Sequence, residues 1–152
     1  MVMKIKLYQV DAFTDRVFRG NPAAVCPLEE WLADDILQKI AMENNLSETA
    51  FYVGNGNHYQ IRWFTPTVEV DLCGHATFAA AFVLFHHEGH EGNEIQFVSP
   101  RSGELRVTRN DDRLTLNFPA DHIESVEITQ DIINGFDIKP QSVYKGQSDI
   151  LL

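Results

Sequence analysis

Residues 64–81 read Phe64-Thr-Pro-Thr-Val-Glu-Val-Asp-Leu-Cys-Gly-His-Ala-Thr-Phe-Ala-Ala-Ala81 and are the most informative part of the sequence. It predicts a strand, a sharp turn at Cys73-Gly74-His75, and then a helix of small and apolar residues. The first N–H groups of a helix have no hydrogen-bond partner within the helix, and together they carry roughly half a positive elementary charge. The turn therefore gathers free N–H groups at one spot, where a carboxylate, a phosphate or an enolate would bind.

The helix after this turn is apolar on nearly every side. We expect it to run from about His75 to about His87 and to stop near Gly89. A helix without a polar face needs to be covered all round. Residues 76–84 are therefore predicted to lie buried inside a sheet.

Alternating polar and apolar residues predict a strand at 4–11, and a short apolar run after a turn signal predicts another at 23–26. Further strands are predicted at 49–53, 59–64, 95–99, 103–109 and 113–118, and a helix at 34–44. Gly-Asn-Gly-Asn at 54–57 is a tight hairpin turn, because Asn and Gly tolerate positive φ. Tight turns join antiparallel strands, so the fold class is α+β with a mostly antiparallel sheet.

The chain changes character after residue 118, which predicts two domains, 1–118 and 119–152. Within the second, residues 128–135 suggest a short helix with Thr129 as its N-cap and Gly135 at its end. Residues 149–152 look like a strand. A strand needs a neighbour, and we expect this one to lack it because no strand follows.

Composition limits the possible functions. The chain has 152 residues, 44% of them hydrophobic, which is typical of a folded protein. Its formal net charge of −10 argues against nucleic-acid binding, because no basic stripe can displace counterions. No stretch has the roughly 20 apolar residues of a membrane helix, and the N-terminus alternates like a strand and lacks the apolar h-region of a signal peptide. We expect a cytoplasmic protein with Cys26 and Cys73 as reduced thiols.

Glu48 is a candidate acid and base. It lies between a helix end and a strand, beside the apolar Leu46, Ala50 and Phe51. Desolvation there would raise the pKa of the carboxyl toward neutrality, where it can both take up and release a proton. The alternative is a solvated loop carboxylate, or one held by neighbouring N–H groups.

Other candidates surround the turn. His75 would orient a substrate or relay a proton, or else pack against the sheet as a structural residue. Cys73 would be an activated thiol at the helix N-terminus, or a small buried residue. Asn21 is a turn residue or a ligand-facing amide. His86, His87 and His90 have the spacing of a metal site, although histidines near a helix C-terminus also interact favourably with the helix dipole.

Four ordered segments together resemble the phenazine-biosynthesis PhzF-like isomerases. They are Val10-Asp-Ala-Phe13 with Gly20-Asn-Pro-Ala-Ala-Val25, Ile40-Ala-Met-Glu-Asn-Asn-Leu-Ser-Glu-Thr-Ala-Phe51, Arg62-Trp-Phe-Thr-Pro66 and Glu69-Val-Asp-Leu-Cys-Gly-His-Ala-Thr77. The resemblance implies the fold of diaminopimelate epimerase. In that fold, two similar lobes each wrap a curved sheet around a central helix, and the active site lies between them.

The resemblance also implies a reaction without metal or organic cofactor. Glu48 would move a proton on a small carboxylate substrate, with His75 as the second catalytic residue. Asn21, Ser47, Gly74 and Ala76 would bind the substrate. Related epimerases use two cysteines, and Cys73 of this chain lies at the position of one of them.

Members of this family normally have two lobes and run well beyond 250 residues, whereas this sequence has 152. Residues 119–152 would then be the crossover and the start of an incomplete second lobe. Two hypotheses follow: an isomerase seen through its N-terminal lobe, and an inactive single-lobe remnant that dimerises or binds ligands weakly. A homodimer of such halves is expected because the two lobes are related by pseudo-symmetry. Metal binding by the three clustered histidines is a third hypothesis.

Overall fold

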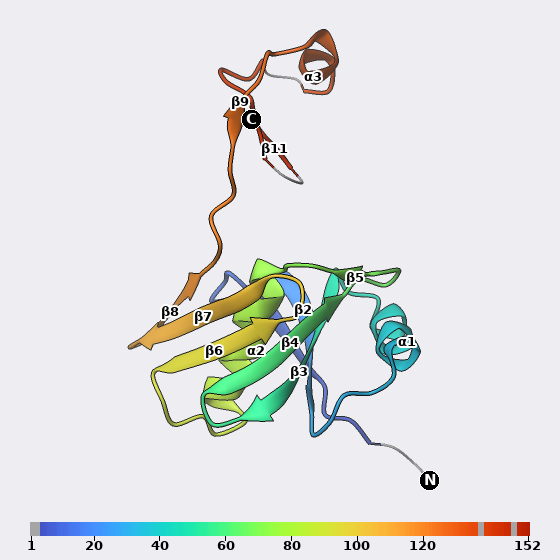
Figure 1. The fold of residues 1–152 in the computed structure, drawn as a ribbon, viewed down its shortest axis with the longest axis vertical. Helices are drawn as coiled ribbons and strands as arrows, with labels where there is room; N and C mark the ends of the chain where they lie inside the picture. Colours follow the sequence, from blue (N-terminus) through green and yellow to red (C-terminus); the bar gives the residue numbers. More distant parts are fainter. Residues whose placement is uncertain (1–3, 137–138, 147–148) are drawn as a thin grey trace. The chain divides into compact units, whose positions relative to one another are not determined.

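Helix α2, Gly74–His86, is the central element of the first of two compact units. The computed structural model describes residues 4–136, 139–146 and 149–152; the first unit ends at Phe118 and the second begins at Pro119. The strands of the first unit curve around α2 (Figure 1). They are β1 (Tyr8–Ala12), β2 (Asn21–Leu28), β3 (Glu48–Asn55), β4 (His58–Phe64), β5 (Glu69–Val70), β6 (Glu94–Ser99), β7 (Gly103–Asn110) and β8 (Arg113–Asn117).

The sheet runs in the order β1-β2-β3-β4-β6-β7-β8, with β5 paired to β4. Two neighbouring pairs are parallel, β2 with β3 and β4 with β6, and the others are antiparallel. Each parallel pair has a helix between its strands in the sequence: α1 (Asp34–Asn44) after β2, and α2 after β4. The expected α+β class with a mostly antiparallel sheet is confirmed.

Burial of α2 follows from its composition. Most of its side chains are buried, and they pack with the inward residues of the strands into the main core. One side of the helix is less covered, where Phe82 is 37% exposed and His86 is exposed. The predicted burial is therefore confirmed for most of the helix.

A second, smaller core lies on the outer face of the sheet. Helix α1 places Leu37 and Ala41 against Cys26, Phe51 and Phe64. Alternation along β3 explains the two cores, because Ala50 and Tyr52 belong to the main core while Phe51 belongs to the outer one. The predicted bounds of α1 are confirmed, and Asn45 ends the helix at φ 51°.

Two strand predictions need correction. The first strand begins at Tyr8 rather than residue 4, since its ladder with β2 starts opposite Val25. Strand β2 is longer than residues 23–26, because its last residues continue in parallel pairing with β3 as far as Leu28 opposite Val53. The hairpin between β3 and β4 occurs as predicted.

The second unit contains a small three-stranded sheet and a short helix. Its elements are β9 (Glu124–Ser125), α3 (Gln130–Asn134), β10 (Tyr144–Lys145) and β11 (Ile150–Leu151). The cap of α3 is confirmed: the Thr129 hydroxyl accepts the Ile132 N–H at 3.4 Å. The expectation that the last strand lacks a neighbour is wrong, because β11 pairs with β10, which precedes it. That this unit begins a second lobe stays a prediction.

None of the helices in the described parts of the chain is long and apolar enough to cross a membrane.

Candidate active site

The ends of three elements meet at the start of α2. Parallel strands have their N-terminal ends at the same edge of a sheet, and β2 and β3 are such a pair, with Ala23 opposite Glu48. This pairing brings Asn21, the first residue of β2, close to Ser47 and Glu48 at the start of β3. The first turn of α2 adds His75 to the same place.

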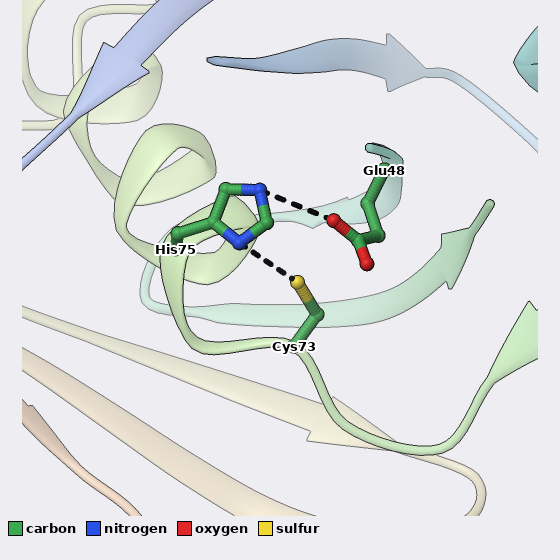
Figure 2. Close-up of side chains that lie close together, drawn as sticks. All are labelled: Glu48, Cys73 and His75. Carbon is green, nitrogen blue, oxygen red and sulfur yellow. Dashed lines mark hydrogen bonds and ion pairs between the residues drawn. The ribbon is translucent and has the colours of Figure 1, made fainter. Parts of the chain in front are cut away.

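Glu48 and His75 face each other in this cluster. Their closest atoms, Glu48 Oε2 and His75 Nε2, are 3.2 Å apart (Figure 2), and the side chains are 20% and 9% exposed. The distance suits an ion pair, yet Glu48 Oε2 is buried and makes no hydrogen bond of good geometry. We therefore take this as an electrostatic contact in which the N–H is not aimed at the oxygen. The result is a buried carboxylate oxygen without a hydrogen-bond donor of its own.

The imidazole of His75 is neutral at physiological pH. Burial lowers the pKa of His75, and this effect outweighs the Glu48 charge and the Pro22 carbonyl, which both raise the pKa. A neutral imidazole has one N–H and one bare nitrogen, so it can donate and accept at the same time. Ser47 Oγ lies 3.2 Å from Nε2, and also 3.1 Å from the carbonyl of Pro22.

Cys73 contacts the other edge of the same ring. Its Sγ lies 3.4 Å from His75 Nδ1, and Figure 2 marks this contact with a dashed line. The residue is 7% exposed, and burial raises the pKa of its thiol to about 12 even though the N–H groups of Ala76 and His75 favour the thiolate. The structure thus supports the alternative that Cys73 is a small buried residue carrying a protonated thiol, rather than an activated nucleophile.

The residues expected to bind substrate lie at this site, but they differ in how far solvent or a ligand can reach them. Asn21 and Ser47 are exposed and joined by a hydrogen bond of 3.2 Å. Gly74 lets the helix start approach its neighbour closely, since a Cβ there would lie 3.2 Å from the Phe118 ring. Ala76 is fully buried, so it could reach a ligand only through its backbone. Its N–H faces the sulfur of Cys73, which partly occupies the anion-binding spot predicted at the helix start.

The three clustered histidines do not converge as metal ligands within the described part of the chain, and their rings lie against aromatic or backbone groups instead. His86 packs on Phe82, with ring centroids 4.4 Å apart, and His87 stacks on Tyr8 at 5.3 Å. His90 Nε2 lies 3.0 Å from the carbonyl of Glu94. Their divergence counts against the third hypothesis.

Glu48, Cys73 and His75 are the group of three metal-ligating side chains that converges within the described ranges, their ligand atoms lying within 4.8 Å of one another. A single ion would bind one imidazole nitrogen, with the other ligands gathered around it. Here the thiol lies at Nδ1 and the carboxylate at Nε2. The arrangement suits a chain of polar contacts through the ring better than a shared ion.

The contact between Cys73 and His75 was not foreseen from the sequence. Residues two apart do not share a face within a helix, but Cys73 is the N-cap and has extended backbone, at φ −144° and ψ 111°. The change from extended to helical backbone turns the two side chains toward each other. If Cys73 had been identified as the N-cap of the predicted helix, the contact with His75 could have been predicted from the sequence.

Comparison with known proteins gives a consistent result. Residues 10–138 match the family model described as phenazine biosynthesis-like protein, PhzC-PhzF. The chain is 51% identical over 150 residues to an uncharacterized isomerase of Pseudomonas aeruginosa, and the alignment covers 99% of this chain and 57% of that protein. It is also 50% identical over 125 residues to the human phenazine biosynthesis-like domain-containing protein, covering 77% of this chain and 43% of that one. The chain spans about half the length of the curated relatives it matches.

Solved structures agree with these matches. A PhzF-family protein from Enterococcus faecalis superposes with a TM-score of 0.89 at 46% identity, over 97% of this chain and 56% of that one. A predicted epimerase from Pseudomonas aeruginosa superposes with a TM-score of 0.62 over 80% of this chain and 45% of that one. At 24% identity, that second likeness shows the shared epimerase fold alone.

Proposed function

This chain belongs to the phenazine biosynthesis-like (PhzC-PhzF) family, and from that premise we propose that it carries the Glu48 half of the active site of a cofactor-independent isomerase. The reaction is a proton shift on a small carboxylate substrate. Glu48 removes a proton next to a double bond or carbonyl group and returns it to another carbon.

The observation that carries this proposal is the position of the Glu48 carboxylate. Oε2 is buried, makes no hydrogen bond of good geometry, and lies 3.2 Å from an imidazole. A carboxylate oxygen without a hydrogen-bond donor has a lone pair available for a substrate proton. The side chain is still 20% exposed, which leaves a path for a substrate proton to reach it.

His75 and the start of α2 have supporting roles. The neutral imidazole presents polar atoms beside Glu48 without placing a second charge there. Exposed Asn21 and Ser47, together with the helix N-terminus, bind the substrate carboxylate, and the helix charge also stabilises negative charge that develops during proton removal. This local attraction offsets the overall charge of −10, which repels anions at long range.

The rest of the site comes from outside the lobe described above. The relatives are nearly twice as long as this chain. We therefore assign closure of the site, and with it substrate specificity, to a second lobe or to a second copy of this chain.

The test is exchange of substrate hydrogen with solvent deuterium. The protein is incubated in D₂O, without added metal or cofactor, with small carboxylic acids that have a C–H next to a double bond or carbonyl, and exchange is followed by proton NMR. The wild-type protein exchanges one position, and Glu48→Gln loses at least about a hundredfold in rate, as expected for loss of a general base.

Glu43→Gln is the matched control, because Glu43 is an exposed carboxylate near the end of α1. It should exchange at the wild-type rate. Exchange in Glu48→Gln at that same rate would show that another group is the base.

A second candidate function concerns this lobe taken on its own. A single lobe leaves the site open to water, which weakens every electrostatic interaction in it. The alternative is an inactive module that dimerises or binds small carboxylates weakly. It predicts no exchange with any of the acids, and a dimer in solution.

A further inference from the structure

The imidazole of His75 lies between a thiol and a carboxylate, and the proton on the ring can occupy either nitrogen. Nδ1 faces Cys73 Sγ at 3.4 Å, and Nε2 faces Ser47 Oγ and Glu48 Oε2, each at 3.2 Å. The ring is neutral, so one of these nitrogens carries the proton and the other carries a lone pair. The two tautomers differ in which edge of the ring faces the proposed base.

Electrostatics favour the proton on Nε2. The alternative would direct the Nε2 lone pair toward the side where the Glu48 carboxylate lies, which is repulsive. With the proton on Nε2, the N–H donates to Ser47 Oγ and its positive end lies beside Glu48. The Ser47 hydroxyl can then donate to the carbonyl of Pro22 at 3.1 Å or to Asn21 Oδ1 at 3.2 Å.

This tautomer leaves Nδ1 bare inside the protein, and a bare buried nitrogen needs a donor. The thiol of Cys73 fills that role: the residue is 7% exposed, and burial keeps its proton in place. A thiolate there would instead place a second negative charge close to Glu48.

We propose that Cys73 is a positioning residue that donates its S–H to His75 Nδ1, and so fixes the tautomer whose Nε2–H lies beside Glu48. The contacts of the ring with Cys73, Ser47 and Glu48 support this assignment independently of any reaction. Its consequence for catalysis rests on the proposed function: the ring would keep one orientation and present a constant N–H dipole to the base and to the substrate.

The test is ¹⁵N NMR of the ring nitrogens of histidine-labelled protein, which tells a protonated nitrogen from a bare one. The wild-type protein should show His75 in the Nε2–H form. Cys73→Ala removes the donor and should shift the tautomer ratio about fivefold toward Nδ1–H, as expected for one neutral hydrogen bond. Cys73→Ser restores a donor and should return the ratio toward wild type.

Cys26→Ala is the matched control, because it removes an equally buried thiol from the outer core and should leave His75 unchanged. An Nδ1–H ring in the wild-type protein would overturn the proposal even if the alanine variant fails to fold. If folded Cys73→Ala kept the wild-type ratio of His75 tautomers, Cys73 would contribute packing alone and the proposal would be wrong.

Isotope exchange then separates this inference from the proposed function. If wild-type protein exchanges substrate hydrogen, Cys73→Ala should slow the exchange about fivefold at unchanged KM, and Cys73→Ser should recover it. If wild-type protein exchanges nothing, the proposed function fails while the NMR result still decides the tautomer.

Discussion

Cys26 and Cys73 are both buried free thiols, and burial raises the pKa of each from about 9 to about 12. The thiolate is the reactive form, and each unit of pKa lowers its fraction about tenfold. Both thiols should therefore react about a thousandfold more slowly with Ellman's reagent at pH 8 than a thiol of ordinary pKa. Unfolding in guanidinium should release both at full rate. Rapid reaction of one thiol in the folded protein would show that Cys73 is activated after all.

His75 gives the protein a predictable dependence of stability on pH. Burial lowers the pKa of His75 in the folded state, so around and below pH 6.5 the unfolded chain binds a proton that the folded protein does not. Stability therefore falls as the pH drops below about 6.5, by up to about 1.4 kcal/mol per pH unit, until the lowered pKa is reached. We expect urea unfolding of His75→Gln to change less between pH 7.5 and 5.5 than that of the wild type.

The exposed His122 provides the control for this experiment, its side chain being 90% exposed. His122→Gln should keep the wild-type pH dependence. Parallel pH curves for wild type and His75→Gln would mean that His75 titrates alike in the folded and unfolded states.

Helix α2 shows how far composition decides burial. Leu84 is 2% exposed in the main core, whereas Leu72, just before the helix, is 38% exposed. Leu84→Ala should lower the free energy of unfolding by about 2–5 kcal/mol, because the cavity it leaves cannot fully collapse. Leu72→Ala should cost well under 2 kcal/mol in the same denaturation experiment. Equal losses would mean that α2 is not the centre of the core.

The sequence was sufficient for some elements and insufficient for others. The bounds of α1, the hairpin and the burial of α2 could be predicted because Asn-Gly turns and helical periodicity are local signals. The extent of β2 depends on its neighbours instead: only parallel pairing with β3 carries it to Leu28. The two-residue strand β5 is too short for any periodicity, and is held to β4 by pairing and by the Arg62–Glu69 ion pair at 2.7 Å.

The candidate site likewise combines features that the sequence predicts with features that depend on tertiary structure. Glu48 and His75 are far apart in the sequence, and nothing local indicates that they meet; the family resemblance suggested it. Their meeting depends on the antiparallel pairing of β3 with β4, which places Thr49 opposite Phe64 and so brings the chain out of β4, on its way to α2, at the edge where β3 begins. The predicted hairpin at 54–57 implies this edge, but the turn at residues 65–73 that leads into α2 gives no local signal of where it places His75.

The less covered side of α2 is the surface of the first unit that bears on the oligomeric state. A groove of about 530 Å³ lies there between β1 and the β7–β8 turn, with Phe13, Phe78 and Phe82 in its wall. Phe13 is 72% exposed and Phe82 37%. Exposed apolar patches of this kind mark interaction sites. In a solution of this chain alone, the partner we expect is a second copy, with a dimer mass of twice 17.3 kDa, about 34.6 kDa.

Charge makes this dimer sensitive to salt. Each copy carries a formal net charge of −10, so two copies repel each other, and salt screens this repulsion while leaving apolar contacts in place. Sedimentation equilibrium should therefore show tighter association at about 0.5 M salt than at about 0.05 M, where the Debye length is several times longer. Phe82→Glu should abolish the dimer, whereas Val98→Glu, at a residue on β6 that is 42% exposed, should not. A mass of 17.3 kDa at every concentration and salt level would exclude the homodimer, and closure of the Glu48 site would then require a second lobe.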